Sequence, residues 1–427
     1  MGNEWQTLSL DQALDINPKV QLERGKIYPF VDMQAIDISV RDVYQSEVRV
    51  FQGNGSRFQD GDTLVARITP CLENGKIARY RSCDNIKVGH GSTEFIVVRG
   101  RENVTDNLFA YYLIRSDNVR RYLVSQMTGS SGRQRVPVSA FAEIKAEIPP
   151  LLEQKAIAEI MNTFDNKIEL NRQMCKTLEE TAQAIFKSWF VDFDPVHAKA
   201  SGKQPEGMKQ EIAALFPDSF EDSDYGRKPK SWTTGSLDQI GTFLNGLALQ
   251  KYLPSADNWL PAIKIAQLRT NDVKNADQVS ADISEEYIVQ DGDILFSWSG
   301  SLECVIWTGG KGALNQHLFR VTSDEYPKWF IYFWIHHHLP EFRHIAAGKA
   351  TTMGHIQRHH LKDAKVVIPS PDILDRAHRT INPMFESIIL RSLESKRLEN
   401  IRDLLLPQLI SGKLQVSDAE KIVKRCS

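Results

Sequence analysis

Apolar residues recur every three or four positions along two long stretches of the chain, which is the pattern of one helix face. In each stretch these residues form a narrow seam along one helix face that continues for about ten turns. Such a seam is typical of a coiled coil rather than of a helix on a broad core. The first seam consists of Ile157, Ile160, Phe164, Ile168, Asn171, Cys175, Leu178, Ala182, Ile185 and Trp189. The second seam consists of Ala377, Ile381, Met384, Ile388, Arg391, Ser395, Leu398, Ile401, Leu405 and Leu409.

Three polar residues interrupt these seams: Asn171 in the first, and Arg391 and Ser395 in the second. Polar residues at such positions fix helix register at a cost in stability. Because the chain supplies two such helices, we expect them to pair with each other as an antiparallel coiled coil. This arrangement predicts a pseudo-twofold axis with one globule at each end. Pro383 is expected to kink the second helix or delay its start.

The chain repeats a series of short landmarks in the same order. Trp-x₃-Ser-Leu-Asp-Gln, Asp-Gly-Asp, an aromatic helix start, Ile-Pro and a Lys-x-Leu-Glu helix segment each occur twice, 220–231 residues apart. Alternating apolar strands such as Glu94–Arg99, bounded by Gly and Asn turns, precede each helix. The sequence therefore predicts an α+β fold of two tandem mixed α/β globules, each followed by a long helix.

This organisation predicts six segments. They are a first globule (1–150), a first helical region (151–193), a linker (194–230), a second globule (231–369), a second helical region (370–414) and a C-terminal tail (415–427).

Composition narrows the class of protein. A chain of 427 residues with 41% hydrophobic and 25% charged residues is typical of a soluble protein with two or three domains. No apolar run is long enough to span a bilayer, and the N-terminus lacks the pattern of a secretory signal. The five cysteines are scattered, which favours a reducing cytoplasm. The net charge of −2 means that nucleic-acid binding would depend on local patches.

Catalytic patterns are weak. Phe51–Gly55 matches a methyltransferase cofactor loop, but it is preceded by a charged run and is better interpreted as a hairpin turn. Asp60, Asp62, Glu73 and Lys76 loosely imitate a nuclease set, although Asp-Gly-Asp more simply begins a strand. The histidines from His336 to His360 lack metal-ligand spacing, so a solvated or DNA-facing role is favoured over a metal site. We therefore expect no catalytic or metal site on this chain, and no cofactor of its own.

Two loop regions at equivalent places in the repeats carry basic residues and no acidic ones: Asn118–Gln134 and Phe342–Lys362. Arg, Gln, Asn, Ser and Thr on Gly-hinged loops are suited to phosphate contacts and to reading base edges. The candidate DNA-binding residues of the first globule are Arg67, Thr69, Asn74, Lys76, Arg120, Arg121, Ser130, Ser131, Arg133, Gln134 and Arg135. Those of the second are Ser299, Ser301, Arg343, Lys349, Thr351, Thr352, His355, Gln357 and Arg358.

Taken with these features, the chain resembles the specificity subunit of type I restriction–modification enzymes over essentially its whole length. The most specific segment is Ile148–Val196, supported by Asp60–Lys76 and by "LLPQLISGKL" at Leu405–Leu414. The resemblance implies two recognition domains that each read one half of a bipartite DNA site. It also implies that the coiled coil sets the unread spacer between the half-sites. The second helical region departs from the family's usual start, with "SPDILDRAHRTINP" at 370–383.

The resemblance also implies partners. Methylation subunits, expected to number two, would bind the helical regions and methylate adenine with S-adenosylmethionine, and restriction subunits would use ATP and Mg²⁺. The recognition loops implied by position are Thr69–Lys76, Ser130–Arg135, Ser297–Ser301 and Lys349–Arg358. Three alternatives stay open at this point: a subunit of a modification-only system, a coiled-coil scaffold that binds protein, and an enzyme that uses Phe51–Gly55 or Asp60–Lys76.

Overall fold

The computed structural model describes residues 4–83, 85–223, 226–255, 257–348 and 354–426. The chain divides into two compact units. Unit one comprises Met1–Leu170 with Ser395–Ser427, and unit two comprises Asn171–Glu394. The boundary passes through both long helices, α5 (Leu151–Phe190) and α12 (Pro371–Ile410), so each unit contains one half of each helix.

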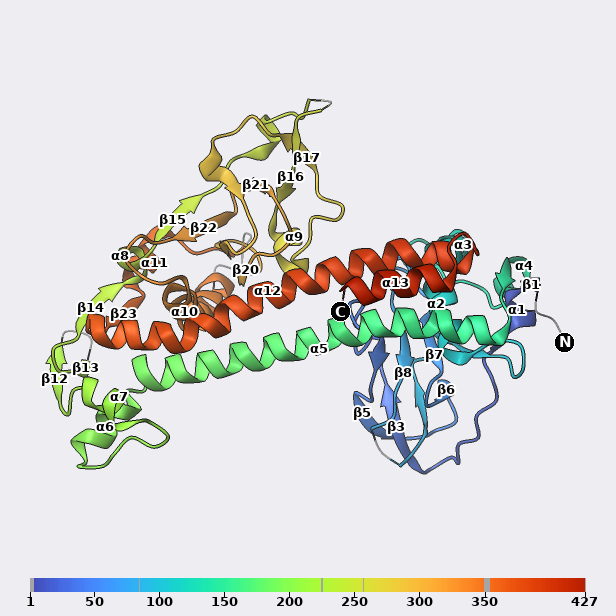
Figure 1. Ribbon diagram of the computed structural model, residues 1–427, viewed down its shortest axis with the longest axis horizontal. Coiled ribbons are helices and arrows are strands. Elements are labelled where there is room, and N and C mark those ends of the chain that lie inside the picture. Colours follow the sequence, from blue (N-terminus) through green and yellow to red (C-terminus); the bar gives the residue numbers. More distant parts are fainter. Residues whose placement is uncertain (1–3, 84, 224–225, 256, 349–353, 427) are drawn as a thin grey trace. The chain divides into compact units, whose positions relative to one another are not determined.

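Unit one contains two larger sheets and a two-stranded one (Figure 1). The five-stranded sheet has the order β2 (Leu14–Ile16), β10 (Phe95–Gly100), β7 (Thr63–Ala66), β8 (Ile77–Tyr80), β4 (Asp42–Val43). The four-stranded sheet has the order β5 (Glu47–Val50), β3 (Ile27–Val31), β9 (Val88–Gly91), β6 (Ser56–Gln59). β1 (Gln6–Ser9) pairs with β11 (Lys145–Ile148), which brings the start of the globule beside the strand that leads into α5.

The helices of unit one share one buried cluster with residues of its five-stranded sheet. They are α1 (Leu10–Ala13), α2 (Asn107–Arg115), α3 (Asp117–Ser125), α4 (Ala140–Glu143) and α13 (Val416–Cys426). α2 begins where the Asp106 carboxylate accepts hydrogen bonds from two backbone amides, which caps the helix. Its aromatic residues pack in one cluster with the first half of α5, the last turns of α12 and the apolar face of α13, which lies alongside α12 (Figure 1).

Unit two repeats this plan. One four-stranded sheet has the order β15 (Thr242–Asn245), β22 (Leu318–Thr322), β19 (Ile294–Ser297), β20 (Cys304–Ile306). The other has the order β17 (Gln278–Ser280), β16 (Trp259–Ile263), β21 (Gly312–Leu314), β18 (Ile288–Val289). β14 (Thr233–Ser236) pairs with β23 (Lys365–Ile368), the counterpart of the β1–β11 pair.

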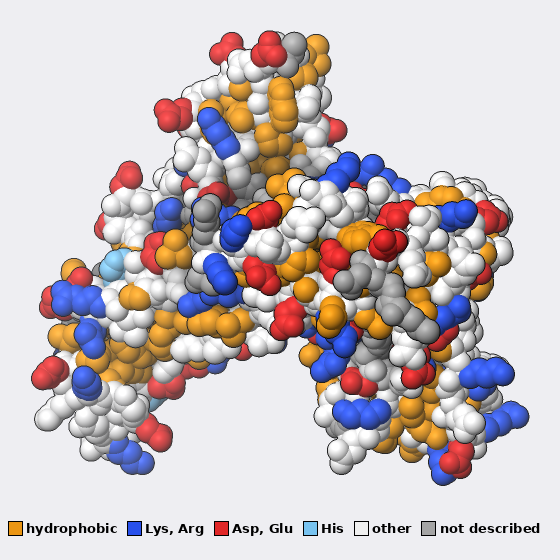
Figure 2. All heavy atoms as spheres, turned by 45° about the vertical axis from the view of Figure 1, so that its right-hand side comes forward, with side chains coloured by type: hydrophobic (Ala, Val, Ile, Leu, Met, Phe, Trp, Pro, Cys, Tyr) orange, Lys and Arg blue, Asp and Glu red, His pale blue; other side chains and the backbone are white. Residues whose placement is uncertain are grey.

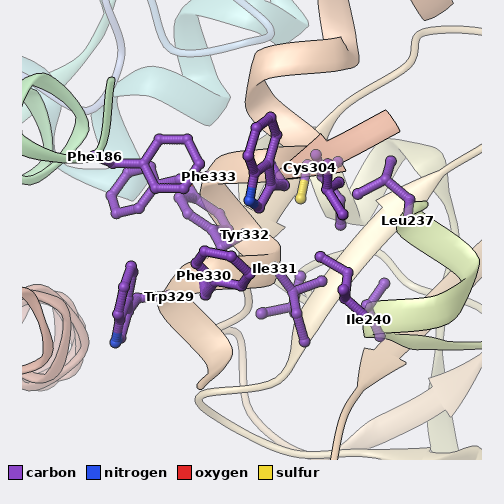
Figure 3. Close-up of a cluster of buried hydrophobic side chains, with 14 of the residues drawn as sticks. Phe186, Leu237, Ile240, Cys304, Trp329, Phe330, Ile331, Tyr332 and Phe333 are labelled. Atoms are coloured by element: carbon purple, nitrogen blue, oxygen red, sulfur yellow. The ribbon is translucent and has the colours of Figure 1, made fainter. Parts of the chain in front are cut away.

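The helices of unit two are α8 (Leu237–Ile240), α9 (Ile265–Thr270), α10 (Lys328–Ala347) and α11 (Arg358–Asp363), with short 3₁₀ turns at Leu249–Lys251 and Glu285–Tyr287. Seven consecutive residues of α10, Trp329–Ile335, are buried, and Figure 3 shows Phe333 beside Phe186 of α5. This continuous aromatic run is accommodated because α10 contacts neighbours on several sides.

Residues 194–230, expected as a linker, contain regular structure. They form α6 (Asp194–Ala200), α7 (Gln210–Leu215) and the hairpin of β12 (Phe220–Ser223) and β13 (Gly226–Pro229). Phe216 of this segment is buried against Trp189 and Trp232, with ring centroids 5.2 and 6.3 Å away. The segment is therefore packed onto the core of unit two rather than extended away from it. The domain boundaries themselves stay predictions.

The sequence prediction of two tandem α/β domains with long helices is confirmed. The two Ser-Leu-Asp-Gln copies lead into α1 and α8, the two Asp-Gly-Asp copies precede β7 and β19, and the aromatic landmarks lie in α2 and α10. In each copy the second Asp of Asp-Gly-Asp is paired with an arginine from the neighbouring strand: Asp62 with Arg99, and Asp293 with Arg320.

Contacts between α5 and α12 occur within each unit. In unit one, the Asp165 carboxylate is paired with Arg402. In unit two, the Asn171 amide donates to Glu394, and the Cys175 thiol donates to the Ile388 carbonyl oxygen. Residue numbers rise along one helix as they fall along the other, so the contacts of unit two are antiparallel. A supercoil stays a prediction.

Two details of local structure differ from expectation. α12 begins at Pro371 and continues through Pro383, so this proline does not delay the helix, and a kink there stays a prediction. Phe51–Gly55 is not a hairpin turn, because β5 and β6 on either side of it lie at opposite edges of their sheet. The segment instead carries the chain across two intervening strands, with Gly53 and Gly55 at positive φ.

Candidate nucleic-acid interface

In unit one, backbone hydrogen bonds hold the two predicted recognition loops side by side. The Thr69 amide donates to the Gln134 carbonyl oxygen at 3.0 Å, and the Val136 amide donates to the Arg67 carbonyl oxygen at 2.9 Å. Ile68 and Arg135 form an isolated antiparallel bridge between these bonds. The loop after β7 and the loop before α4 therefore form one surface, as expected for residues that share a function.

The candidate residues of unit one fall into two groups by exposure. Exposed side chains are those of Asn74, Arg121, Ser130, Ser131 and Arg133. Partly buried side chains are those of Arg67, Thr69, Lys76, Arg120, Gln134 and Arg135. Asn74, Ser130, Ser131 and Arg133 lie in loops, whereas Arg120 and Arg121 lie on α3, so the first part of the predicted loop Asn118–Gln134 is helical.

Acidic residues outside the predicted loop neutralise several of its arginines. Arg120 and Arg121 are paired with Asp117 at 3.1 and 3.2 Å. Arg135 forms two hydrogen bonds with the Glu94 carboxylate, Nη2 to Oε1 at 2.7 Å and Nε to Oε2 at 2.9 Å. The hydrogen bond from Arg135 holds the pKa of Glu94 below its ordinary value, so this carboxylate is ionised at neutral pH. The acid-free stretch of sequence therefore has acidic side chains close to it in the folded structure.

Arg67 lies at the edge of a cleft of about 980 Å³ in unit one. Its Nη2 atom donates to the Val136 carbonyl oxygen at 3.2 Å, while its buried Nε atom has no hydrogen-bond partner among the described residues. Arg57 and Lys19 line the same cleft. Lys76 is partly buried, and its ammonium group donates to the Met33 carbonyl oxygen at 2.7 Å.

The loops of unit two are joined in the same way. Ser299 and His355 form an isolated antiparallel bridge, and the Ile356 amide donates to the Trp298 carbonyl oxygen at 2.9 Å. Ser299 is buried, and its hydroxyl lies 3.0 Å from Nδ1 of His317. Ser301, Gln357 and Arg358 are exposed and His355 is partly buried, whereas Lys349, Thr351 and Thr352 lie outside the described residues.

Two arginines near these loops in unit two have structural partners. Arg343, from α10, is paired with Glu303 at 3.0 Å and donates from Nε to the Leu302 carbonyl oxygen. Arg358 lies over the Phe319 ring, 5.7 Å from its centroid, and donates to the Phe243 carbonyl oxygen at 3.3 Å. Both contacts hold the loop chains against the sheet of unit two.

Two histidines of α10, His336 and His338, do not fit the expected solvated or DNA-facing role, whereas His337 and His344 are exposed as expected. Nε2 of His336 lies 3.1 Å from the Cys304 carbonyl oxygen, and Nε2 of His338 lies 2.8 Å from the Lys365 carbonyl oxygen. Burial lowers the pKa of both imidazoles, which favours the neutral form that donates to a carbonyl. These two residues tie α10 to β20 and β23.

The residues that imitated a nuclease set are engaged elsewhere. Asp62 is buried and bound by Arg99 through both carboxylate oxygens, at 2.7 and 2.8 Å. Asp60 accepts a hydrogen bond from the Ser82 amide. In the part of the chain that the structure describes, no group of three His, Cys, Asp or Glu side chains is placed to hold a metal ion.

Charge is dispersed on the surface. On the face shown in Figure 2, Lys and Arg side chains are interspersed with Asp and Glu, consistent with the net charge of −2. Among the described helices, none has both the length and the apolar character that a membrane span requires.

Comparison with known proteins gives the class of this protein. Residues 42–180 and 229–396 match the family described as type I restriction modification DNA specificity domain. The two matches together cover more than half of the chain, one for each copy of the repeat. The chain therefore belongs to the family of type I restriction–modification DNA specificity domains, which makes it a DNA-recognition subunit rather than a catalytic one.

Individual relatives agree with this assignment. The chain is 27% identical over 424 residues to the specificity subunit of the type I restriction enzyme HindI from Haemophilus influenzae, covering 86% of this chain and 90% of that protein. It is 24% identical over 370 residues to the EcoAI specificity subunit of Escherichia coli, covering 69% and 61%. The crystal structure of a type I restriction–modification S subunit from M. genitalium shares the fold, with a TM-score of 0.53, 14% identity and coverage of 95% and 96%.

Sequence reasoning missed two residues that come just before an interior strand of a sheet. Glu94 precedes β10 and binds Arg135, and His317 precedes β22 and contacts Ser299. Trp298 lies within the predicted loop Ser297–Ser301 but was not singled out; its ring lies between His317 and His355, with ring centroids 5.7 and 6.3 Å away. Matching "TEFIVVRG" to "QHLFRVTS" would have placed Glu94 and His317 at equivalent positions.

Proposed function

We propose that this chain reads a bipartite DNA target, with unit one contacting one half-site and unit two the other. The proposal is supported by one observation above others. The two units hold equivalent loops by the same backbone bridge, Ile68 to Arg135 and Ser299 to His355, but carry different side chains there. A common frame with different exposed groups is suited to the recognition of two different short sequences.

In this proposal the chain directs chemistry that partner subunits perform. Two modification subunits would methylate adenine with S-adenosylmethionine, and restriction subunits would act with ATP and Mg²⁺. The helices α5 and α12 are proposed as the docking surface for the modification subunits. Exposed leucines on both helices support this assignment: Leu152, Leu170, Leu390 and Leu404 are 83, 50, 66 and 67% exposed.

The helix-seam residues predicted from the sequence are proposed to hold this frame. Ile157, Ile160, Phe164, Ile168, Leu398 and Leu405 belong to the buried cluster of unit one. Ile381 and Ile388 belong to the buried cluster of unit two, with Leu178, Ile185 and Met384 packed against it, and Asn171 is buried in the same unit. Burial of a continuous seam would keep both helices straight enough to act as a spacer.

The test is to express the chain together with its modification subunit and to map methylated adenines across a genome. The expected result is a split motif, with two short specified halves separated by a fixed run of unspecified bases. A continuous motif would contradict the assignment of one reader to each unit. A stable complex that methylates nothing would instead favour a scaffold without DNA specificity.

A further inference from the structure

Three backbone hydrogen bonds occur at matched positions in the two units and define a common register for the reading loops. In unit one the amide of Arg67 donates to the carbonyl oxygen of Glu94 (2.9 Å), that of Val136 to Arg67 (2.9 Å), and that of Thr69 to Gln134 (3.0 Å). In unit two the amide of Trp298 donates to the carbonyl oxygen of His317 (3.3 Å), that of Ile356 to Trp298 (2.9 Å), and that of Gly300 to Gly354 (2.8 Å). These hydrogen bonds therefore place Arg67 and Trp298, Glu94 and His317, and Arg135 and His355 at equivalent positions in the two units.

The side chains at these matched positions differ in charge and shape. Unit one has two arginines and a carboxylate at these positions, with Arg135 held by Glu94, whereas the described residues of unit two place two imidazoles and an indole there. The Trp298 indole donates to the Asn245 side chain at 2.9 Å, which fixes its plane. A difference confined to the side chains of a shared frame is the pattern expected of specificity determinants.

The geometry of the Arg135–Glu94 pair leaves one edge of the guanidinium for another partner. Glu94 takes the edge formed by Nε and Nη2, at 2.9 and 2.7 Å. The opposite edge, formed by Nη1 and the second hydrogen of Nη2, retains the fork that matches O6 and N7 of guanine. Among the described residues, Nη1 makes one long contact of 3.3 Å, to the Arg133 carbonyl oxygen. The Arg135 side chain is 43% exposed against 24% for Glu94, so the arginine is the outer member of the pair.

We propose that Arg135 reads a guanine in the half-site of unit one, and that Glu94 is a positioning residue that holds the guanidinium plane for this contact. The inference rests on the proposed function and assigns a base and two residues to it. In unit two the matched residues, His355 and His317, lack the fork, so the half-site read by unit two is specified by different contacts at this position.

A phosphate contact is the competing role for the same guanidinium, because phosphate also accepts a fork of two hydrogen bonds. The two roles differ in what a mutation changes. Loss of a base contact relaxes one position of one half-site, whereas loss of a phosphate contact weakens binding at all sites alike.

The experiment maps methylated adenines for the full chain with its modification subunit, comparing wild type with R135K, E94Q and R81K. R135K keeps the charge and removes the fork, and we expect discrimination at one G·C position of one half-site to fall on the order of 10–100-fold. E94Q keeps the shape of the side chain and removes its charge, so a smaller loss at the same position is expected. R81K is the matched control, because Arg81 is an arginine of the same unit paired with Asp60 and its side chain is 43% exposed, like that of Arg135, so its motif should be unchanged.

Three outcomes would overturn the inference. The first is an R135K motif as strict as that of wild type, and the second is a uniform fall in methylation with no change in motif. The third is relaxation in both half-sites. If E94Q relaxes a position that R135K does not, Glu94 contacts DNA directly and its positioning role is wrong. Failure of the proposed function is a separate result, because wild type itself would then give no split motif. Thermal unfolding of each complex identifies a variant that lowers methylation through misfolding.

Discussion

The guanidinium of Arg402 on α12 lies 2.6 Å from the carboxylate of Asp165 on α5, with side-chain exposures of 8 and 4%. The second carboxylate oxygen of Asp165 accepts a hydrogen bond from the Tyr112 hydroxyl at 2.7 Å. Arg402 also binds Asp403 at the solvent edge. One buried ion pair therefore joins three elements of unit one: both long helices and α2.

Substitution of Arg402 by Met should destabilise unit one strongly, because it leaves the Asp165 carboxylate buried without its cation. Breaking a buried pair from one side costs about 3–5 kcal/mol. The double variant R402M/D165N should recover much of this loss, since an amide is cheaper to bury and still accepts from Tyr112. Urea unfolding of the three proteins measures the difference.

The matched control for that prediction is R379M on the same helix. Arg379 is paired with Asp375, but both side chains are more than half exposed, so the free energy of unfolding should change by less than about 1 kcal/mol. If R402M were as mild as R379M, the buried pair would not be holding the helices together.

The imidazoles of His336 and His338 should make stability depend on pH. Burial is the largest cause of their lowered pKa values, and it outweighs the hydrogen bonds to carbonyl oxygens that act in the opposite direction. As the pH falls below the ordinary value of 6.5, the unfolded chain takes up protons before the folded chain does. The stability contributed by the neutral imidazoles is therefore complete above pH 6.5 and is lost as the pH falls towards the lower folded values.

The measurement is the free energy of unfolding between about pH 7.5 and about pH 5.5, for wild type and for H336Q/H338Q. A glutamine amide donates to the same carbonyl oxygens without titrating, so the double variant should show a flatter profile over this range. An unchanged slope in the double variant would place the pH dependence on other groups.

DNA binding by the isolated chain should be weak and steeply dependent on salt, because the net charge is −2 and affinity from phosphate contacts arises by counterion release. R133Q should reduce the slope of log affinity against log salt by about 1 if Arg133, an exposed loop residue, neutralises one phosphate. R121Q should have less effect, since Asp117 already pairs with Arg121. Fluorescence anisotropy with a labelled duplex over a salt series tests both, and equal slopes for all three proteins would exclude Arg133 from the phosphate contacts.

Much of the fold was accessible from the sequence because it follows from local periodicity. The seam residues of α5 and α12 recur at helical spacing, and Ile157, Phe164 and Ile381 are buried as their pattern predicts. The repeat of Ser-Leu-Asp-Gln, Asp-Gly-Asp and Ile-Pro was equally visible, since each copy begins or ends an element in both units.

The parts that failed depend on contacts between distant residues. Arg135 was predicted to be available for DNA because the residues that precede it contain no acid. Glu94 lies 41 positions away in sequence and binds Arg135 because the loop is paired with the sheet. The connection at Phe51–Gly55 looked like a hairpin because sequence does not show which strands are neighbours. His336 and His338 looked solvated because nothing local reveals that two strands place carbonyl oxygens beside α10.

The length of the paired helices should set the spacer between half-sites. Inserting about seven residues, two helical turns, into both α5 and α12 adds about 10 Å, or about three base pairs of duplex. The insertions belong after Leu170 and after Glu394, where the chain passes from one unit to the other, so that both copies of the reading frame stay intact. Methylation mapping should then give a longer spacer with both half-sites unchanged, because the loops at Ile68–Arg135 and Ser299–His355 are untouched. A changed half-site with a constant spacer would show that the helices do not act as a ruler, and the spacer would then have to be set within the globules themselves.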